Sequence, residues 1–243
     1  LGSITETIPK PMVKIGDKPI LWHIMNIYSH YGHKDFVISL GYKAEVVKDY
    51  FFNFHRSSND FTIDLYTNKI TIEKENGRLD WKVTLVDTGL NTLKGARIKR
   101  IEQYLDDVNL LTYGDGLVDL DINDLIRFHE SHGKIITITG VRPPSRFGEI
   151  TVKNSKLISF EEKPQTSSGL INGGFMVFNK KLLQYLSDDE KCDLEFGAFH
   201  ELAKQGEMMV YENKKPWECV DTERDLAHLN KLWQANEAFW KVW

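Results

Sequence analysis

The chain has 243 residues, of which 41% are hydrophobic and 27% are charged, and its formal net charge is -4. This composition indicates a globular protein with a real core, and the net negative charge argues against a nucleic-acid binder that works through a broad basic surface. No apolar run is long enough to span a membrane, no secretory leader is visible, and Cys192 and Cys219 have no metal-site spacing, so we expect a reduced, cytoplasmic setting.

The first half of the chain alternates helices and strands. Apolar spacing and capping residues predict helices over 19–31, 43–52, 96–105 and from Asp121 to near Gly133. Short apolar runs predict buried strands over 35–41, 83–86, 109–111 and 135–141. The polar stretch 56–80 is predicted to be an excursion of short strands with a turn at Asn76-Gly77. Such a succession predicts an α/β fold, with a Rossmann-like, mostly parallel sheet flanked by helices.

The second half changes character. Residues 148–160 predict a hairpin that turns at Asn154-Ser155, and residues 172–178 predict a strand. Asp193 is expected to cap a helix that ends near Gly206, a strand follows over 207–211, and Thr222 is expected to cap the last long helix. We see no repeat and no low-complexity linker. The simplest interpretation is one domain with a smaller C-terminal part.

Asp115 is the first candidate site residue. The apolar run that ends at Tyr113 breaks into Gly114-Asp115-Gly116, which places the Asp115 carboxylate at the carboxyl end of a strand beside bare backbone. A hard oxygen ligand at such an edge suits Mg²⁺ and a polyphosphate. The alternative, an ordinary loop Asp that tolerates an unusual turn, stays open at this point.

Two further charged residues fit the same chemistry. Asp221 follows a short apolar strand and precedes a helix cap, so it can be a second metal carboxylate or can simply stabilise the helix dipole. Lys10 stands between Pro9 and Pro11, which fix the backbone and keep the segment extended, so its ammonium is aimed. An aimed ammonium suits a phosphate that gains charge during a reaction. A surface Lys on a rigid loop is the alternative.

Weaker signals surround these three residues. Glu162 and Lys163 follow a strand shortly before Asn172-Gly173, and this group could bind sugar hydroxyls and a sugar phosphate. Nucleotide-reading candidates lie between a strand and the next helix, namely Thr88, Gly89, Thr92 and Arg97. Each of these sets is also common on protein surfaces.

The aromatic and histidine residues give structural expectations. The tryptophans are expected in the core or at subunit contacts, and the apolar tail from Phe239 to Trp243 is expected to dock on its own domain or on a neighbour. His129 and His132 share a predicted helix at a spacing of three, and we expect solvent to surround them.

The ordered set of motifs resembles the sugar-1-phosphate nucleotidylyltransferases, and within them the glucose-1-phosphate cytidylyltransferase branch. The likeness extends from Pro9 to about Trp243. The family motifs, in chain order, are Lys10-Pro11-Met12, Val86-Asp87-Thr88-Gly89, Tyr113-Gly114-Asp115-Gly116, Arg146-Phe147-Gly148, Glu162-Lys163-Pro164, Asn172-Gly173-Gly174-Phe175 and Asp221-Thr222. The Val-Asp-Thr-Gly and Arg-Phe-Gly pieces, and the longer run from Tyr113 to Asp121, resemble the cytidylyl branch.

The resemblance implies transfer of CMP from CTP to α-D-glucose 1-phosphate, with Mg²⁺ as cofactor and release of pyrophosphate. It assigns Asp115 and Asp221 as metal ligands and Lys10 as a catalytic phosphate contact beside Asp115. Nucleotide-binding positions are Gly2, Ser3, Lys10, Thr88, Gly89, Thr92, Arg97 and Gly114, and the sugar-phosphate positions are Glu162, Lys163, Asn172 and Gly173. It also divides the domain into a nucleotide-binding half, 1–142, and a sugar-binding and C-terminal part, 143–243, and it implies a homo-oligomer, a hexamer, with no nucleic-acid or membrane partner.

The start of the chain departs from the family pattern. The family begins with a strand and a Gly-Gly-x-Gly-Thr-Arg loop that cradles the triphosphate, whereas here Leu1-Gly2-Ser3 is followed by Ile4. We expect that the sequence omits residues at its start, because losing the first central strand would uncover the sheet. The alternatives are a non-catalytic nucleotide-sugar-binding or regulatory homologue, and an enzyme that uses UTP or dTTP.

Overall fold

The computed structural model describes residues 1–2, 4–74, 79–143, 149–153, 156–161 and 169–243. Its helices are α1 (Ile4–Thr7), α2 (Ile20–His30), α3 (Ala44–Phe52), α4 (Phe54–Ser58), α5 (Lys94–Arg100), α6 (Ile122–His132), α7 (His200–Lys204) and α8 (Glu223–Gln234). Its irregular helical turns are η1 (Lys10–Met12), η2 (Glu102–Tyr104), η3 (Lys180–Tyr185) and the π-helix η4 (Leu194–Phe199).

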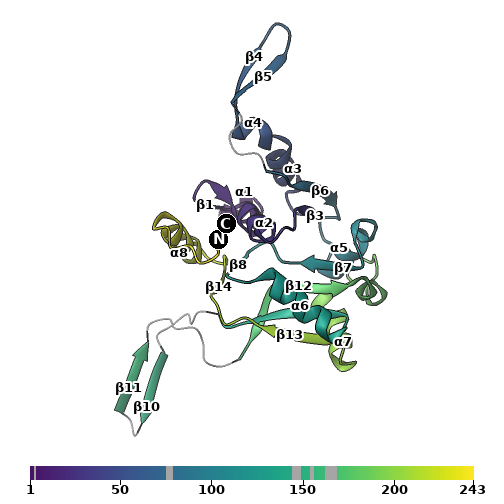
Figure 1. Cartoon of the computed structure of the whole chain (residues 1–243), viewed down its shortest axis with the longest axis vertical. Coiled ribbons are helices and arrows are strands. Elements are labelled where there is room, and N and C mark those ends of the chain that lie inside the picture. Colours follow the sequence, from purple (N-terminus) through teal and green to yellow (C-terminus); the bar gives the residue numbers. More distant parts are fainter. Residues whose placement is uncertain (3, 75–78, 144–148, 154–155, 162–168) are drawn as a thin grey trace.

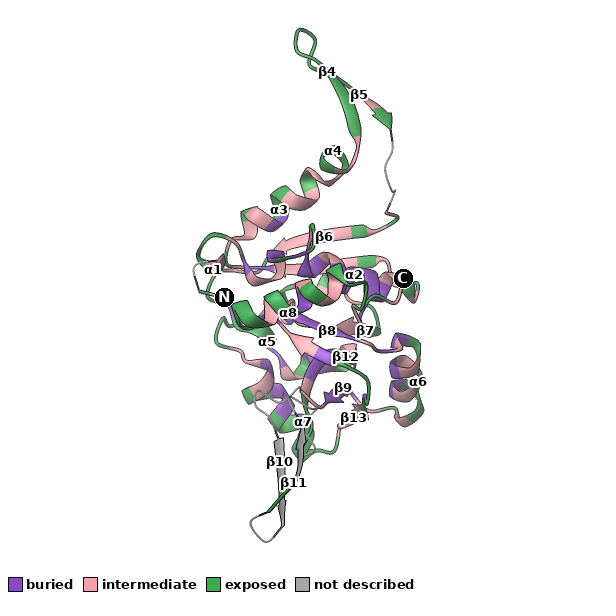
Figure 2. Ribbon diagram, turned by 90° about the vertical axis from the view of Figure 1, so that its left-hand side faces the viewer, coloured by how far each residue is buried: buried purple, intermediate pink, exposed green. Residues whose placement is uncertain are grey.

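The strands are β1 (Lys14–Ile15), β2 (Lys18–Pro19), β3 (Asp35–Leu40), β4 (Asp60–Asp64), β5 (Lys69–Lys74), β6 (Lys82–Asp87), β7 (Val108–Leu111), β8 (Gly116–Val118), β9 (Ile136–Val141), β10 (Glu149–Lys153), β11 (Lys156–Glu161), β12 (Ile171–Asn179), β13 (Met208–Glu212) and β14 (Trp217–Cys219). The predicted strands occur in the predicted order, and β1, β2 and β8 are additional to them. The predicted α/β class is confirmed, and β6, β7, β12, β9 and β13 lie one below the other along the body (Figure 2).

The central sheet is mixed rather than parallel throughout. Its strand order is β13-β9-β12-β7, in which β9 and β13 are parallel but β12 runs antiparallel between β7 and β9. Strands β3 and β6 form a separate parallel pair. The cause is the connection: a parallel neighbour needs a crossover, usually a helix, and the segment between β9 and β12 holds the hairpin of β10 and β11 instead. The prediction of that hairpin is confirmed, and its turn at Asn154-Ser155 lies outside the described residues.

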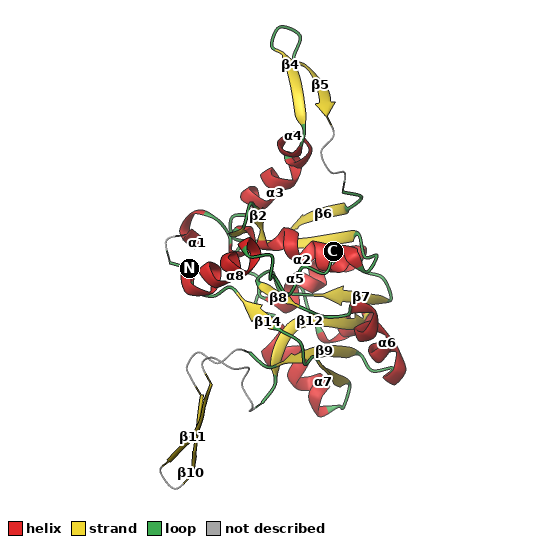
Figure 3. Cartoon of the chain, turned by 60° about the vertical axis from the view of Figure 1, so that its left-hand side comes forward, coloured by secondary structure: helices red, strands yellow, loops and turns green. Residues whose placement is uncertain are grey.

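β12 is the strand around which the body is packed. Its side chains alternate between two hydrophobic clusters, so Phe175 and Val177 face α2 and α6 while Met176 and Phe178 face η3, η4 and α7. All four are no more than 1% exposed. Helix α6 covers β9, β12 and β13 on the first of these faces (Figure 3). A strand buried on both faces reads as a continuous apolar run, which is why the sequence signal at 172–178 is strong.

The predicted excursion between 56 and 80 is a helix and a hairpin. Helix α4 leads into the antiparallel strands β4 and β5, which project from the body (Figure 1). The predicted turn at Asn76-Gly77 lies outside the described residues. Between β4 and β5 the chain reverses at residues 65–68, where Asn68 takes a left-handed conformation with φ 55° and the Asp64 carboxylate accepts backbone N–H bonds from Tyr66 and Thr67.

The C-terminal aromatic tail docks on its own domain, as one of the two expectations had it. Trp240 is fully buried in the first cluster, and its Nε1 donates to Nδ1 of the buried His23 at 3.3 Å. The His23 Nε2 is 3.0 Å from the carbonyl of Ile15. Since the indole can only donate, His23 accepts at Nδ1 and donates at Nε2, so the neutral ring joins the tail, α2 and the β1–β2 turn.

The expectation that solvent surrounds the histidine pair of α6 is wrong for His129. This side chain is 2% exposed, and its Nδ1 lies 2.9 Å from the hydroxyl of Thr137 on β9. Nε2 of His132 lies 2.8 Å from the same hydroxyl. The helix face that carries both rings packs on the sheet, because Leu125 one turn earlier is also buried there. Burial lowers the pKa of His129 to about 4.

Within the described residues, no helix has both the length and the apolar character that crossing a bilayer requires.

Candidate active site

A short antiparallel ladder brings the two candidate carboxylates together. Strand β8 begins directly after Asp115, and β14 ends two residues before Asp221. The strands pair with Cys219 opposite Gly116, and the backbone N–H of Val220 donates to the carbonyl of Asp115 at 3.0 Å. Both acidic residues are therefore held at the same edge of the ladder. The sequence predicts each of them at the end of a strand, and the ladder makes the two ends neighbours.

Lys10 joins the pair. Its Nζ donates to Oδ2 of Asp115 at 2.7 Å and to Oδ1 of Asp221 at 2.5 Å. The three side chains are 30%, 31% and 47% exposed in that order, so the cluster lines an accessible surface. Burial lowers the pKa of the Lys10 ammonium, but the hydrogen bonds and charges of the two carboxylates together outweigh burial and hold that pKa above its usual value. Lys10 is a cation at neutral pH.

The loop that carries Lys10 is rigid, but it is not extended throughout as the sequence predicts. Pro9 is extended, with φ -69° and ψ 149°, while Lys10, Pro11 and Met12 form a 3-10 turn closed by the bond from Met12 N to Pro9 O at 2.8 Å. Pro11 fits because its fixed φ suits the first turn of a helix. A Cβ on Gly114 would lie 2.6 Å from Cγ of Pro11, so the proline ring rests on the bare backbone beside Asp115.

Cys219 contacts the same cluster from β14. Its thiol donates to Oδ2 of Asp221 at 3.1 Å, on the carboxylate oxygen that Lys10 does not contact. Burial first, and then the hydrogen bond to Asp221, raises the pKa of this thiol to about 12. The thiol is therefore neutral and serves as a donor that fixes the rotation of the Asp221 carboxylate.

The start of β12 lies beside the first residue of β8, because a Cβ on Gly116 would be 3.7 Å from the Gly173 carbonyl oxygen. The carbonyl of Gly173 accepts from Nε1 of the buried Trp217 at 2.8 Å, and Asn172 donates through Nδ2 to the hydroxyl of Tyr113 at 3.1 Å. A Cβ on Gly173 would lie 2.7 Å from Val141, so this position has room only for glycine. Asn172 and Gly173 thus neighbour the Gly-Asp-Gly turn. The other predicted sugar-phosphate residues, Glu162 and Lys163, and the Arg146-Phe147-Gly148 motif lie outside the described residues.

The predicted nucleotide-reading residues gather at the ends of β3 and β6. Arg97 donates through one nitrogen to the carbonyl of Leu40 and to the hydroxyl of Thr88, at 2.8 and 2.7 Å. Its other terminal nitrogen packs against Gly41, where a Cβ would lie 2.4 Å away. Burial lowers the pKa of Arg97, and the nearby Arg100 lowers it further. The guanidinium therefore ties the two strand ends together.

Arg100 is a residue that the sequence reasoning missed. It donates to the Thr88 carbonyl at 2.7 Å and to the hydroxyl of Thr92 at 2.9 Å. Gly89 has φ +95°, and a Cβ there would lie 2.5 Å from that Thr92 hydroxyl. The spacing of three between Arg97 and Arg100 puts both on one face of α5, and that spacing was the available signal.

The N-terminal residues lie beside Asp221. The backbone nitrogen of Leu1 lies 3.0 Å from the Asp221 carbonyl oxygen, and the nearest neighbour of a Cβ on Gly2 would be Oε1 of Glu223, 3.6 Å away. Ser3 lies outside the described residues. The structure thus places Gly2 near the acidic pair.

The donor set of the cluster fits a divalent hard cation. Among the described residues no three His, Cys, Asp or Glu side chains converge on one point, but Asp115 and Asp221 converge on the Lys10 ammonium. Two carboxylates with phosphate oxygens and water are the ligands that Mg²⁺ takes in phosphate sites. The ammonium shows that a positive charge is stable between them.

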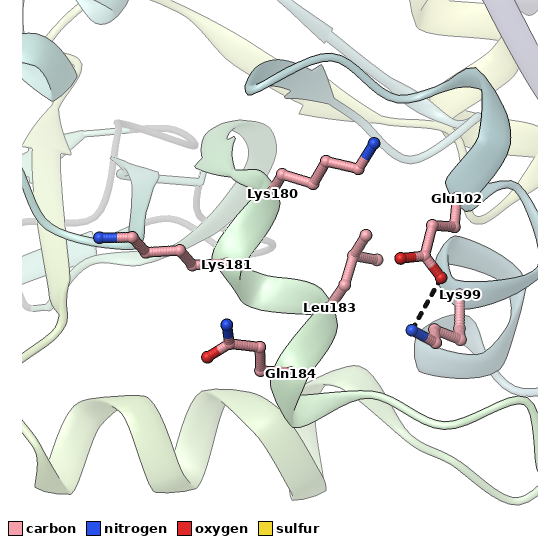
Figure 4. Close-up of a pocket in the computed structure, with 6 residues that line it drawn as sticks. All are labelled: Lys99, Glu102, Lys180, Lys181, Leu183 and Gln184. Atoms are coloured by element: carbon pink, nitrogen blue, oxygen red, sulfur yellow. Dashed lines mark ion pairs between the residues drawn. The ribbon is translucent and has the colours of Figure 1, made fainter.

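A pocket of about 400 Å³ lies elsewhere, between η2 and η3, and is lined by Lys99, Glu102, Lys180, Lys181, Leu183 and Gln184 (Figure 4). Lys99 is paired with Glu102 at 2.8 Å, and Lys180 donates to the carbonyl of Leu105 at 2.9 Å. Lys181 and Gln184 point away from these residues in Figure 4. The lysines do not converge, so the pocket does not compete with the Lys10 cluster as a candidate site.

Comparison with known proteins identifies the family of this chain. The model of the nucleotidyl transferase family matches residues 1–240. The chain belongs to the nucleotidyl transferase family. This nucleotidyl transferase is 44% identical over 242 residues to the glucose-1-phosphate cytidylyltransferase of Salmonella typhimurium, covering 98% of this chain and 93% of that protein. It is 40% identical over 244 residues to a probable glucose-1-phosphate cytidylyltransferase of Bacillus subtilis, covering 100% and 95%. The resemblance predicted from the motifs is confirmed.

Solved structures share the fold of this nucleotidyl transferase. A putative glucose-1-phosphate thymidylyltransferase from Bacillus anthracis superposes with a TM-score of 0.66 at 18% identity, over 96% of this chain and 89% of that one. HddC from Yersinia pseudotuberculosis gives 0.62 at 22% identity, over 93% and 90%. At these identities the likeness establishes the fold, so the site has to be argued from this chain's own residues.

Proposed function

We propose that the protein transfers CMP from CTP to α-D-glucose 1-phosphate and releases pyrophosphate. The convergence of Lys10, Asp115 and Asp221 at the edge of the β8–β14 ladder carries the reaction class, because it combines an aimed cation with two hard oxygen ligands. The choice of CTP and glucose 1-phosphate rests on relatives of that name, 44% and 40% identical over nearly the whole chain.

In this reaction the protein acts mainly by positioning the two substrates and by neutralising negative charge on the phosphates. A phosphate oxygen of glucose 1-phosphate forms a bond to the α-phosphorus of CTP, and the bond from that phosphorus to the bridging oxygen of pyrophosphate breaks. Pyrophosphate leaves with the electron pair of the broken bond. The Lys10 ammonium is positioned to neutralise charge on the phosphate oxygens, and the rigid Pro9–Pro11 turn keeps it there.

Asp115 and Asp221 would hold Mg²⁺. Bound there, the ion would act as a Lewis acid on phosphate oxygens. The two carboxylates share the single positive charge of the Lys10 ammonium, at 2.7 and 2.5 Å. The Cys219 thiol and the Val220–Asp115 backbone bond fix the two carboxylates before any ligand binds. This arrangement reduces the reorganisation that binding requires.

The remaining predicted contacts divide between the two substrates. For the nucleotide we propose Gly2, Ser3, Lys10, Thr88, Gly89, Thr92, Arg97 and Gly114. For the sugar phosphate we propose Glu162, Lys163, Asn172 and Gly173. The positions of the described members support this division, since Thr88 and Arg97 share the β3–β6 end whereas Asn172 and Gly173 lie at the start of β12. We accordingly keep 1–142 as the nucleotide half and 143–243 as the sugar and C-terminal part.

We further propose a homo-oligomer, a hexamer as the family resemblance implies, and a cytoplasmic location. The location is supported by the two free cysteines, Cys192 and Cys219, which are typical of a reducing compartment. Size-exclusion chromatography with light scattering measures the oligomeric state directly. A monomer at all concentrations would contradict the hexamer.

The first test is pyrophosphate release by the full-length protein with Mg²⁺ and glucose 1-phosphate. CTP, UTP, dTTP, ATP and GTP are compared under one condition. Release of pyrophosphate with CTP alone supports the proposal. Release mainly with UTP or dTTP would contradict the proposed nucleotide and support the proposed type of reaction. Absence of release with every nucleotide, from a sample shown to be folded, favours the non-catalytic binding homologue.

The second test concerns the metal and does not depend on turnover. Lys10→Met leaves the two carboxylates without their ammonium and keeps a side chain of similar length. Without the Lys10 ammonium the two neighbouring carboxylates attract a cation more strongly. Mg²⁺ should therefore raise the Tm of this variant more than that of the native protein. An equal rise in both proteins, or none, would contradict the assignment of Asp115 and Asp221 as metal ligands.

A further inference from the structure

A chain of polar contacts links the sugar side of the site to the π-helix η4. The Tyr113 hydroxyl lies 2.6 Å from Oε1 of Glu195 on η4, and Asn172 Nδ2 lies 3.1 Å from the same hydroxyl. Asn172 Oδ1 accepts from the backbone N–H of Gly174 at 3.0 Å. Lys94 pairs with the Glu195 carboxylate, and its ammonium sits 4.8 Å from the centre of the Tyr113 ring. Glu195 therefore supports a residue next to the Gly-Asp-Gly turn and, through it, Asn172.

Backbone bonds between two loops hold Lys94 and Glu195 together. Ahead of α5, the N–H of Leu93 donates to the carbonyl of Glu190 at 2.8 Å, and within its first turn the N–H of Ala96 donates to the carbonyl of Cys192 at 3.1 Å. Gly95 permits this contact, because a Cβ there would lie 2.8 Å from that Cys192 carbonyl. The ion pair thus sits on a preformed junction. The junction also contains a π-helix. Such helices are rare in proteins, and those that occur are often found at functional sites.

The direction of each hydrogen bond follows from the charges. An ionised carboxylate only accepts, so the Tyr113 hydroxyl donates its proton to Glu195. Its oxygen is then left to accept from Asn172, which fixes the amide with its nitrogen toward Tyr113 and its oxygen toward Gly174 N–H. The second amide N–H of Asn172 has no recorded acceptor within the described part of the chain.

The aromatic ring also shapes the backbone that follows Asn172. Gly174 has φ +85°, and a Cβ there would lie 2.7 Å from Cδ2 of Tyr113. The ring therefore packs against a glycine in the left-handed region, which only glycine adopts without cost. One residue earlier, the Gly173 carbonyl is held by Trp217. Tyr113 is thus a fixed wall on which the start of β12 rests.

We propose that Glu195 is a positioning residue for the sugar phosphate: through Tyr113 it sets the orientation of Asn172, whose remaining amide N–H is left to bind an oxygen of the sugar 1-phosphate. This rests on the proposed function. Glu195 itself contacts neither substrate, because Tyr113 lies between it and Asn172. No sequence motif points to Glu195, and only the packing of η4 against Tyr113 identifies it.

The experiment compares Glu195→Ala, Glu195→Gln and Tyr113→Phe with the native protein, with Glu201→Gln as the control. Glu201 lies on the neighbouring helix α7, is exposed, and has only Gln205 as its recorded hydrogen-bond partner in the described structure. KM and kcat are measured separately for glucose 1-phosphate and for CTP. Glu195→Ala should raise the KM for glucose 1-phosphate about tenfold and change the KM for CTP less than about twofold.

The conservative and double variants separate positioning from general damage. Glu195→Gln keeps an oxygen that can accept from Tyr113, so it should restore the KM for glucose 1-phosphate to within about threefold of the native value. Glu195→Ala combined with Tyr113→Phe should be no worse than Tyr113→Phe alone, because both changes cut one chain. The Tm of every variant is recorded beside the kinetics.

Three results would overturn the proposal. They are an unchanged KM for glucose 1-phosphate in Glu195→Ala, equal rises in both KM values with a lowered Tm, and full additivity in the double variant. If Glu195→Ala does not fold, Tyr113→Phe serves in its place, because it keeps the ring and removes the hydroxyl that links Glu195 to Asn172. The same KM for glucose 1-phosphate is then measured. An inactive native protein would reject the proposed function instead, whereas an active native protein with an unaffected Glu195→Ala rejects only the positioning role.

Discussion

Asp115 and Asp221 are held on one cation: both carboxylates accept from the Lys10 ammonium, at 2.7 and 2.5 Å. The backbone supports this contact, because Val220 N–H donates to the Asp115 carbonyl just outside the β8–β14 ladder. The ammonium also separates two like charges that would otherwise repel at this range. A site with this arrangement is prepared for an exchangeable cation and for phosphate.

Replacing either carboxylate should stop turnover without unfolding the protein. We expect Asp115→Asn and Asp221→Asn each to lower kcat/KM by at least about a hundredfold, because each removes a charge that would hold the metal at the reacting phosphate. The stability should change little, since the ion pairs are part-exposed and such pairs contribute roughly 0–1 kcal/mol. Pyrophosphate release and thermal melting measure the two effects.

Asp80→Asn is the matched control for these variants. Asp80 also pairs with a lysine, Lys34 at 2.6 Å, and both of these side chains are exposed. Its replacement should leave activity unchanged. If Asp115→Asn kept near-native activity, or lost its fold, the assignment of Asp115 to the metal would be wrong.

Gly114→Ala should damage the loop that carries Lys10. The new Cβ would lie 2.6 Å from the ring of Pro11, and a proline ring on a closed 3-10 turn cannot move aside without moving Lys10. We expect a loss of about 1–3 kcal/mol in the free energy of unfolding and a fall in kcat of about tenfold. Gly197→Ala is the control, because a Cβ there meets nothing within 4 Å. Equal behaviour of the two variants would show that Pro11 does not position the site.

The thiol of Cys219 should tune the Mg²⁺ requirement. Cys219→Ala removes the donor to Oδ2 of Asp221, so the Mg²⁺ concentration for half-maximal activity should rise about tenfold. Cys219→Ser keeps a donor and should stay within about threefold of the native value. A titration of activity against Mg²⁺ measures both, with Cys192→Ser as the control, because the Cys192 thiol accepts from the backbone N–H of Ser187. A serine variant as impaired as the alanine variant would refute the hydrogen-bond role.

His23 should make the free energy of unfolding depend on pH in the acidic range. Burial lowers its pKa from 6.5 to about 4 in the folded protein, so in this range the unfolded chain binds a proton that the folded chain excludes. Its contribution to stability is therefore lost as the pH falls from about 6.5 to about 4, by at most about 3 kcal/mol. Urea unfolding at several pH values measures this slope.

His23→Gln isolates that contribution. The Gln amide can still donate to the Ile15 carbonyl but does not titrate, so the slope between pH 6.5 and 4 should be shallower than in the native protein. His30→Gln, an exposed change on the same helix α2, should leave the slope as it is. Identical slopes in native protein and His23→Gln would mean that His23 is already protonated in the folded state.

Local patterns in the sequence determine most elements and several of their ends. Asp121, Asp193 and Thr222 were expected as N-caps, and each accepts the backbone N–H three residues later. These features depend only on neighbours within one turn, so composition and spacing reveal them. The same holds for Asp115 and Asp221, each of which follows a short apolar strand. The role of either carboxylate was left undecided by the residues alone.

Tertiary structure decided what these residues meet. β12 is antiparallel because of the connection that precedes it, His129 is buried because α6 turns that face to the sheet, and Glu195 reaches Tyr113 because η4 packs against the end of β7. Lys10, Asp115 and Asp221 come from three distant parts of the chain and meet only when β8 pairs with β14. Hydrophobic periodicity specifies which face of an element is buried, but it does not specify the partner, which is fixed by the packing of the whole chain.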